Sequence, residues 1–245
     1  MRFYLGQSVS NDHPLKNVLE KFHSPKNDDL MVVMGGDGSM LEAVKKHGPG
    51  HIYLGLNYGT LGFLMNEVGD DQISLIEAIE QGSYSVRPFP RLQMETDTGK
   101  TDLALNDVYM ERASGQTARL RIEVDGECIV EKLVCDGVIV STALGSTAYN
   151  VSAGGPTSHP FVSAIYLTPI APHTPRLRPV VLPPDVGVDI YSVGDPDTRP
   201  VRVLADGRGH GKTVRTEICK ADDIHLAFFK EHSFTRALVQ KVLLS

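Results

Sequence analysis

The chain has 245 residues, of which 41% are hydrophobic and 22% are charged, values typical of a globular protein with one large or two modest domains. Its net charge of -6 and isoelectric point near 5.8 argue against a broad nucleic-acid-binding surface, which would need a basic stripe. Three widely spaced cysteines without a Cys-x-x-Cys pair support neither a disulfide framework nor a zinc site, and no apolar run approaches the ~20 residues that span a bilayer.

The beginning of the chain and its cysteines also predict a compartment. Arg2 is followed within a few positions by polar residues, so we expect no signal peptide. Unpaired cysteines fit a reducing environment. We therefore expect a soluble cytoplasmic protein with neither a membrane nor a nucleic acid as its partner.

Residues 1–87 predict strands that alternate with helices. The strands are expected at Arg2 to Leu5, at 30–34 and at Ile52 to Leu56, and the helices from Pro14, from Met40 to Gly48, and up to Gly82. This alternation is typical of a doubly wound, Rossmann-like parallel sheet, in which ligands bind at the carboxyl ends of the strands.

From residue 88 the pattern changes to short β-like runs separated by Gly, Asp and Pro. The runs are Leu103 to Met110, Ala118 to Val124, Leu133 to Val140, Val180 to Leu182, Val186 to Val193 and Val201 to Ala205. We expect a second, β-rich domain over 88–227. The tail 228–245 is mildly helical and is expected to pack back on the first domain.

An acidic residue inside a glycine turn follows the buried strand at 30–34. Gly35, Gly36 and Gly38 would let backbone N–H groups approach a bound oligophosphate, because no Cβ intervenes. Asp37 beside such a site would be electrostatically costly, so it calls for a metal, a hydroxyl to deprotonate or a ribose to hold. A plain surface turn between a strand and a helix remains the alternative, since Asp and Gly are common turn residues.

Two familiar glycine motifs do not fit. Counting from Gly36, the dinucleotide fingerprint would need glycine where Leu41 stands. Residues 206–213 resemble a P-loop, but Asp206 occupies its first glycine position and no amphipathic helix follows. We interpret 206–213 as a turn between strands.

Residues 135–156 form the densest remaining group of polar and small side chains. A strand begins with Asp136, and the Ser/Thr/Gly-rich segment after it offers hydroxyls and close backbone approach to a ribose or phosphate, with Tyr149 available to stack on a base. A glycine-rich loop with a core tyrosine is the alternative. The pair Asn106-Asp107 is either a third candidate for ligand binding or a simple turn.

Together these motifs resemble the NAD kinases. The matching segments are Gly35-Gly-Asp-Gly38, Asn106-Asp107, Asp136 to Tyr149, Ser152 to Pro156, Ile170 to Pro179 and Asp206-Gly207. They occur in the order and spacing of that family, over about residues 29–230. Three separated motifs in register are far more specific than the glycine turn alone.

The resemblance implies an α/β N-terminal domain, a β-sandwich C-terminal domain and a kinase activity. The reaction would transfer a phosphoryl group from ATP, or from polyphosphate in some relatives, to the 2′-hydroxyl of the adenosine ribose of NAD. Asp37 would be the base, and Gly35, Gly36, Gly38 and Ser39 would bind phosphate. NAD would contact Asn106, Asp107, Asp136, Thr147, Ala148, Tyr149, Ser152 and Asp206. Mg²⁺ would accompany ATP without a dedicated protein cage, and the enzyme would be a homodimer or homotetramer.

The chain departs from the family's pattern at two places. The family usually has Asn-Glu where this chain has Asn106-Asp107, which retracts the carboxylate by one methylene. It usually has Thr-Pro-Thr-Gly where this chain has Thr142-Ala143-Leu144-Gly145, so the hydroxyl contact of the second threonine is expected to be absent or replaced at Leu144. A lipid kinase shares the glycine turn, and a non-catalytic nucleotide-binding protein would bind NAD without turnover. Both stay open as alternatives to be tested.

Overall fold

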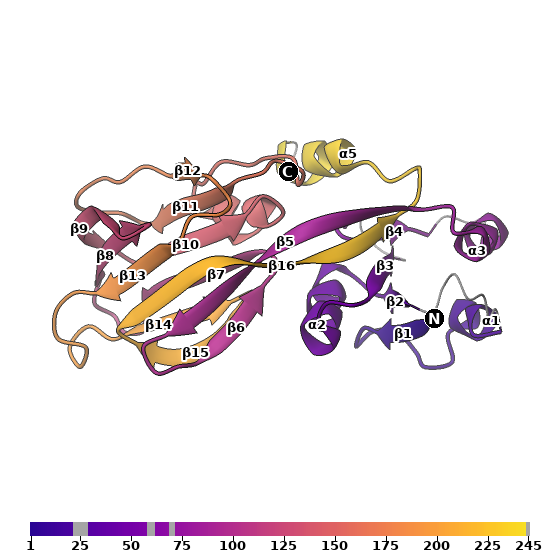
Figure 1. Cartoon of the computed structure of the whole chain (residues 1–245), viewed down its shortest axis with the longest axis horizontal. Coiled ribbons are helices and arrows are strands. Elements are labelled where there is room, and N and C mark those ends of the chain that lie inside the picture. The colour runs from indigo at the N-terminus through magenta and orange to yellow at the C-terminus, as the bar shows by residue number, and fades with distance from the viewer. Residues whose placement is uncertain (22–28, 58–61, 69–71, 244–245) are drawn as a thin grey trace. The chain divides into compact units, whose positions relative to one another are not determined.

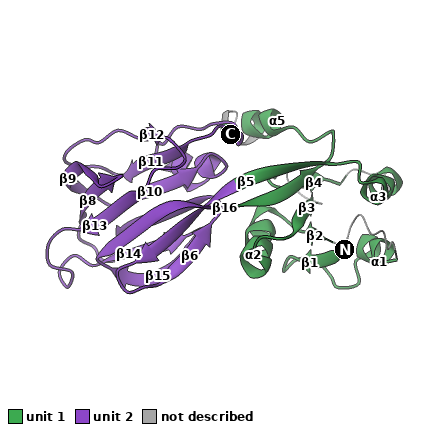
Figure 2. Cartoon of the chain, in the orientation of Figure 1, with its two compact units in different colours: residues 1–89, 223–245 green, residues 90–222 purple. Residues whose placement is uncertain are grey.

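The computed structural model describes residues 1–21, 29–57, 62–68 and 72–243. These residues fall into two compact units, which Figure 2 colours separately. Unit 1 comprises residues 1–89 and 223–245, and unit 2 comprises residues 90–222. Strands β5 (Ser85–Thr96) and β16 (Arg215–Phe228) each contribute residues to both units.

Unit 1 is built on a parallel sheet. Its strands are β1 (Arg2–Leu5), β2 (Leu30–Met34), β3 (Ile52–Asn57), β4 (Asn66–Glu67) and the last residues of β16 (Figure 1). β2 pairs with β1 and β3, and β3 also pairs in parallel with β16 and with β4. Its helices are α1 (Pro14–Leu19), α2 (Asp37–His47), α3 (Gln72–Gln81) and α5 (Phe234–Leu238), followed by a π-helical turn at Val239–Leu243.

The sequence of β2 explains its central place. All five residues of Leu30–Met34 are buried, as expected for a strand that is covered on both faces of a parallel sheet. Helix α2 buries Met40, Ala43 and Val44. It ends at Gly48, whose φ of 66° suits a residue without a Cβ. The glycine turn therefore sits between two well-anchored elements.

Unit 2 is a sandwich of two antiparallel sheets. One contains β8 (Ala118–Val124), β9 (Glu127–Cys135), β13 (Val188–Ser192) and the start of β16; β5 continues into unit 2 and pairs with β6 (Thr101–Ala104). The other sheet has the order β12 (Val180–Leu182), β11 (Ile165–Ile170), β10 (Gly137–Thr142), β7 (Asp107–Arg112), β14 (Val201–Ala205), β15 (Arg208–Thr213).

One hydrophobic core joins the two sheets of unit 2. In β8 the buried residues Ala118, Leu120 and Ile122 alternate with more exposed ones, the period-2 pattern of a strand with one face inward. They share a cluster with Val138 of β10 and Val203 of β14, among others. This rigid sandwich carries the turns that hold most of the predicted NAD-binding residues.

The predicted fold class is confirmed: a parallel α/β region is joined to an antiparallel β-sandwich. Two predicted strands are corrected, however. The run Leu103 to Met110 divides between β6 and β7, and the run Leu133 to Val140 divides between β9 and β10. The breaks fall at Asn106 and Asp136. No helix among the described residues is long and apolar enough to cross a membrane.

Candidate active site

The glycine turn lies at the carboxyl edge of the unit 1 sheet, the edge where its parallel strands end. β2 ends at Met34 and α2 begins at Asp37, with Gly36 as the N-cap in an extended conformation. A Cβ added to Gly36 or Gly38 would meet no atom within 4 Å among the described residues. Open space beside two glycines at a helix N-terminus is suited to a phosphate group.

Gly35 and Ser39 have a different task within the turn. Gly35 adopts a φ of 151°, and a Cβ there would collide with the Ser39 side chain. The same hydroxyl fills the space beside Gly6 at the end of β1. The Ser39 amide donates to the Gly36 carbonyl at 2.9 Å. These contacts set the shape of the turn.

The carboxylate of Asp37 is held by two backbone amides. Phe63 N donates to Oδ2 at 2.9 Å and Leu64 N donates to Oδ1 at 3.0 Å. Gly62 leaves room for this arrangement, because a Cβ there would lie 2.5 Å from Oδ1. These two bonds orient the carboxylate of Asp37.

His232 is a neighbour of Asp37 that the sequence analysis missed. Its ring centroid lies 4.5 Å from the rings of Phe228 and Phe234, and the ring is hydrogen-bonded to the Met65 carbonyl. Burial lowers the pKa of His232 to about 4, although the negative charge of Asp37 and the Met65 bond oppose this shift. The imidazole is therefore neutral at pH 7. The sequence did carry one signal for a buried histidine here, because His232 has Phe228, Phe229 and Phe234 close to it in the tail.

In unit 2, Asp206 organises the turn that contains Asn106 and Asp107. Its Oδ2 accepts the Leu105 amide at 2.9 Å, and its Oδ1 accepts the amides of Asn106 at 2.8 Å and Asp107 at 3.2 Å. The Asp206 amide in turn donates to the Asp107 carbonyl at 2.9 Å. Arg208 lies 3.6 Å from the same carboxylate. Asp206 therefore acts on the backbone of the turn.

Among the acidic side chains of the described residues, Asp107 has the pKa that is shifted furthest from its ordinary value. Its side chain is buried, with 3% of the residue exposed. Burial, followed by repulsion from Asp206, raises the pKa of Asp107 to about 7. Near neutral pH this group can therefore either donate or accept a hydrogen bond, a useful property beside ribose hydroxyls.

The segment from 142 to 149 packs directly against the Asn106 turn. The Thr142 hydroxyl donates to the Leu105 carbonyl at 2.7 Å and accepts the Gly145 amide at 3.0 Å. A Cβ on Gly145 would collide with the Asn106 carbonyl, so glycine is required for this close approach. The contact anchors the start of this segment against Asn106.

Tyr149 stands among acidic groups at the start of helix α4 (Tyr149–Ser152). Its ring centroid lies 5.0 Å from that of Tyr109 in an edge-to-face arrangement. Burial, and then the charges of Glu111, Asp107 and Asp136, raise the pKa of Tyr149. Thr147 and Ala148 are half-buried, and Ser152 is exposed at the other end of the helix.

Asp136 lies at the break between β9 and β10. Its Oδ1 is 2.7 Å from Nε of Arg112, and 38% of each side chain is exposed. Its amide donates to the Ile170 carbonyl, and its carbonyl accepts the Arg112 amide. The predicted site residues therefore form two groups: Gly35 to Ser39 in unit 1, and Asn106, Asp107, Asp136, 147–152 and Asp206 in unit 2.

Comparison with known proteins decides the family. The chain is 37% identical to the NAD kinase of Xanthomonas oryzae pv. oryzae over 212 residues, 84% of this chain and 81% of that protein. It is likewise 37% identical to the NAD kinase of Zymomonas mobilis subsp. mobilis over 223 residues, 88% of this chain and 85% of that protein. The chain belongs to the NAD kinase family. The predicted resemblance is thereby confirmed.

Domain and structure comparisons agree with this membership. The model of the ATP-NAD kinase C-terminal domain matches residues 105–225. An NAD kinase from Archaeoglobus fulgidus, solved in complex with ATP, is 27% identical with a TM-score of 0.81, and the match covers 99% of each chain. Yeast NADH kinase, solved with NADH, is 26% identical with a TM-score of 0.77, covering 93% of this chain and 75% of that one. The predicted enzyme class, a phosphotransferase, is that of these relatives.

Within the NAD kinase family, the chain's departure at Leu144 has a structural counterpart. Leu144 is buried, with 5% exposed, and so belongs to the interior of unit 2. The hydroxyl of Thr142 bridges the Leu105 carbonyl and the Gly145 amide on the same segment. The turn against Asn106 is therefore held without a hydroxyl at position 144.

Proposed function

We propose that the chain phosphorylates NAD at the 2′-hydroxyl of its adenosine ribose, using ATP, and so forms NADP. Family membership supports phosphorylation of NAD. The observation that carries the proposal for this chain is the geometry of Asp37: a carboxylate fixed at a helix N-terminus, between two glycines where an added Cβ would meet no atom within 4 Å in the described part of the chain.

Asp37 is the base in this proposal. It accepts the hydrogen of the ribose 2′-hydroxyl while the hydroxyl oxygen attacks the γ-phosphorus, and the bond to the bridging oxygen of ADP breaks. The amides of Phe63 and Leu64 hold the carboxylate in one orientation, so little reorganisation is needed when the hydroxyl arrives. General-base assistance of this kind contributes about 10²- to 10⁴-fold.

The amides around Gly36 and Gly38 receive the phosphates of the donor. The described residues contain no group of three or more His, Cys, Asp or Glu side chains that could enclose a metal ion. Mg²⁺ fits such a site as a partner of ATP, because it keeps several waters and binds chiefly through substrate phosphates. Bound in that way, it would supply neutralisation of charge on the transferring phosphoryl oxygens.

The unit 2 group binds the dinucleotide. Asn106 and Asp107 present an amide and a buried carboxyl from a turn whose backbone is fixed by Asp206. Thr147, Ala148 and Ser152 offer hydroxyls and an unencumbered backbone, and Tyr149 offers an aromatic face. Asp136 supplies a carboxylate toward the nicotinamide end.

The deciding assay starts from purified protein, NAD, ATP and Mg²⁺, and detects NADP with a strictly NADP-dependent dehydrogenase. Production of NADP is expected, and Asp37→Asn protein serves as the matched control. Parallel reactions with polyphosphate and with NADH define the donor and the acceptor. No NADP with either donor would overturn the proposal, and a lipid kinase or a non-catalytic NAD-binding protein would then be tested by lipid phosphorylation and by NAD titration.

The enzyme is further proposed to be a cytoplasmic homodimer or homotetramer. This proposal rests on the family resemblance, and the exposed apolar side chains of Val181 and Phe161, which are 55% and 50% exposed, are compatible with it. Light scattering coupled to gel filtration gives the number of subunits. A monomer across micromolar concentrations would contradict this assignment.

A further inference from the structure

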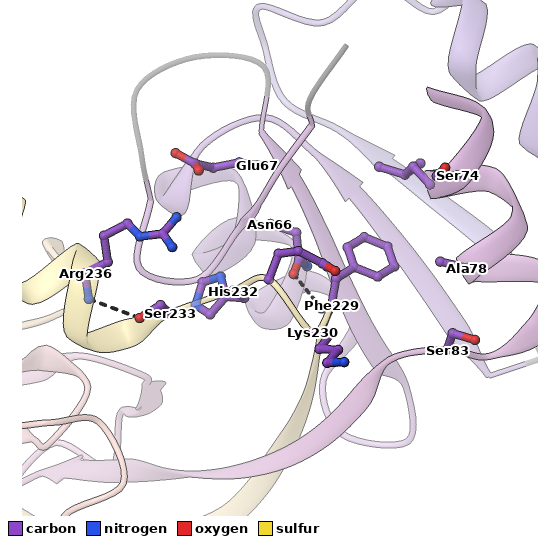
Figure 3. A pocket seen from close by; sticks show the side chains of 12 residues that line it. Asn66, Glu67, Ser74, Ala78, Ser83, Phe229, Lys230, His232, Ser233 and Arg236 are labelled. Carbon is purple, nitrogen blue, oxygen red and sulfur yellow. Dashed lines mark hydrogen bonds between the residues drawn. The ribbon is translucent and has the colours of Figure 1, made fainter. Parts of the chain in front are cut away.

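Two pockets of about 550 Å³ each are found among the described residues. The first lies in unit 1, and its lining includes Asn66, Phe229 and His232 (Figure 3). His232 feels the charge of Asp37, so this pocket belongs with the candidate active site. The second lies wholly in unit 2, and its described lining contains neither the glycine turn nor any predicted NAD-binding residue.

The second pocket lies where two long strands enter unit 2. It is lined by Arg91 and Gln93 of β5, by Leu103 of β6, by residues 219–222 of β16 and by Asp185, which precedes β13. Strands β5 and β16 both pass from one unit to the other (Figure 2). A volume of this size is in the range of small-molecule sites. A ligand in this pocket would therefore contact both connecting strands.

Arg91 is a buried cation without a carboxylate partner. Only 4% of the residue is exposed, and its Nε donates to the backbone carbonyl of Asp222 at 2.9 Å. Among the described residues, its two terminal nitrogens make no hydrogen bond or ion pair, and neither nitrogen is fully buried, so both are open to the pocket. Because charged side chains are seldom buried unless they are paired, this guanidinium calls for an anion from outside the chain.

The other charged groups of the pocket do not supply that anion. Lys220 Nζ lies 2.9 Å from Oδ1 of Asp185, so these two charges pair with each other. Asp222 is exposed and meets Arg91 through its carbonyl rather than through its carboxylate. One cation is thus available to a ligand, and the two nearby acids would repel a ligand with more than one negative charge.

The chemistry of the lining points to a small organic acid with one carboxylate. The terminal nitrogens of a guanidinium form a planar fork that matches the two oxygens of a carboxylate. A phosphate group, with about −1.5 to −2 charge at pH 7, would be repelled more strongly by the two acids. The rest of the lining suits an uncharged body: Leu103 is apolar, Gln93 offers an amide, and burial raises the pKa of the Cys219 thiol, which is therefore neutral at pH 7.

We propose that this pocket is a second ligand site, in which the terminal guanidinium nitrogens of Arg91 bind the carboxylate of a small organic acid and Leu103 packs against its uncharged body. The site lies outside the candidate active site, and the proposal does not depend on the kinase reaction. Because the acid binds the folded chain, it stabilises that state by mass action.

The first test uses the unmodified protein and two probes of the same shape, benzoate and benzamide, of which only the first is charged. Cys219 lines the pocket, so bound benzoate should shield its thiol from iodoacetamide. At ~10 times the dissociation constant of benzoate, the alkylation rate of Cys219 should fall about 10-fold, because only the free fraction reacts. Cys128 is exposed and outside the pocket, and its unchanged rate is the internal control. No protection by benzoate, or equal protection by benzamide, would overturn the proposal.

Calorimetric titration with benzoate at constant ionic strength tests the role of Arg91 directly. Arg91→Lys keeps the charge but not the fork, so it should weaken benzoate binding about 10-fold, the loss of one charge-assisted hydrogen bond. Lys220→Arg is the matched control, because it makes a conservative exchange at the other cation of the pocket and keeps the pair with Asp185. It should leave the affinity unchanged. Equal losses in the two variants, or tighter binding of inorganic phosphate than of benzoate, would reject the assignment.

Discussion

The carboxylate of Asp206 accepts the backbone amide of Asn106 at 2.8 Å, across 100 residues of sequence. The same carboxylate also accepts the amides of Leu105 and Asp107. Three charge-assisted bonds to one turn fix the direction in which Asn106 and Asp107 project. The role of Asp206 in NAD binding stays a prediction. These contacts indicate that it would act through the backbone of the turn.

An Asp206→Asn substitution should loosen this turn. Asparagine tolerates the φ of 45° at position 206 but has one acceptor oxygen for three amides. We expect a loss of about 1–3 kcal/mol in the free energy of unfolding, and a KM for NAD that rises more than kcat falls. Urea unfolding and steady-state kinetics measure the two effects.

Asp125→Asn is the control for this substitution. Asp125 has a φ of 50° in another turn and accepts a single amide, from Gly187. It should leave the KM for NAD unchanged. If both variants behave alike, the turn at Asn106 is not controlled by Asp206.

Replacing Asp37 by asparagine should lower turnover by about 10²- to 10⁴-fold, because an amide cannot take the proton of a hydroxyl. The binding of NAD should remain measurable by calorimetry, since the dinucleotide contacts are assigned to unit 2. The circular dichroism spectrum should match that of the parent. Turnover within a few-fold of the parent would remove Asp37 from the role of base.

Stability should depend on pH through Asp107. Burial and the neighbouring Asp206 raise its pKa to about 7, whereas in an unfolded chain it titrates near ~4. The folded protein holds a proton that the unfolded chain releases, so this group's stabilising contribution is complete below about pH 4 and is lost as the pH rises to about 7. Asp107→Asn should abolish that decline, measured as the urea midpoint at roughly pH 5 and pH 8.

His232 should give the opposite slope. Burial lowers its pKa to about 4, below the unfolded value of ~6.5. The contribution is therefore complete above about pH 6.5 and is lost as the pH falls toward 4. A His232→Gln variant keeps a side-chain N–H for the Met65 carbonyl and should lose this acid sensitivity. An unchanged acid limb in the urea midpoint would contradict the burial of a neutral ring.

Gly145→Ala should be harmful where Gly115→Ala is harmless. A Cβ at Gly145 would collide with the backbone of Asn106, whereas one at Gly115 meets no atom within 4 Å among the described residues. We expect the first variant to lose about 1–3 kcal/mol of stability from overpacking and to bind NAD more weakly. Thermal unfolding and NAD titration of both proteins provide the comparison.

Local sequence patterns predicted many elements correctly. The apolar run of β2 and the terminating Gly48 of α2 are features of short segments, and the structure has both where they were expected. The two strand runs that were predicted as continuous break at Asn106 and Asp136. β-propensity could not reveal the first break, because the amides of 105–107 are taken by Asp206, a residue far away in the chain.

By itself, the sequence determined the chemistry of the candidate site: a carboxylate among glycines, an Asn-Asp pair and a small-residue segment, in the spacing of one enzyme family. Only the tertiary structure decided how these groups are supported. The amides that orient Asp37 lie 26 and 27 residues away in the sequence, and the charge of Asp37 acts on His232, which comes from the other end of the chain. Hydrogen bonds, burial and charge repulsion between distant segments arise only when folding brings those segments together, and no local sequence pattern encodes that.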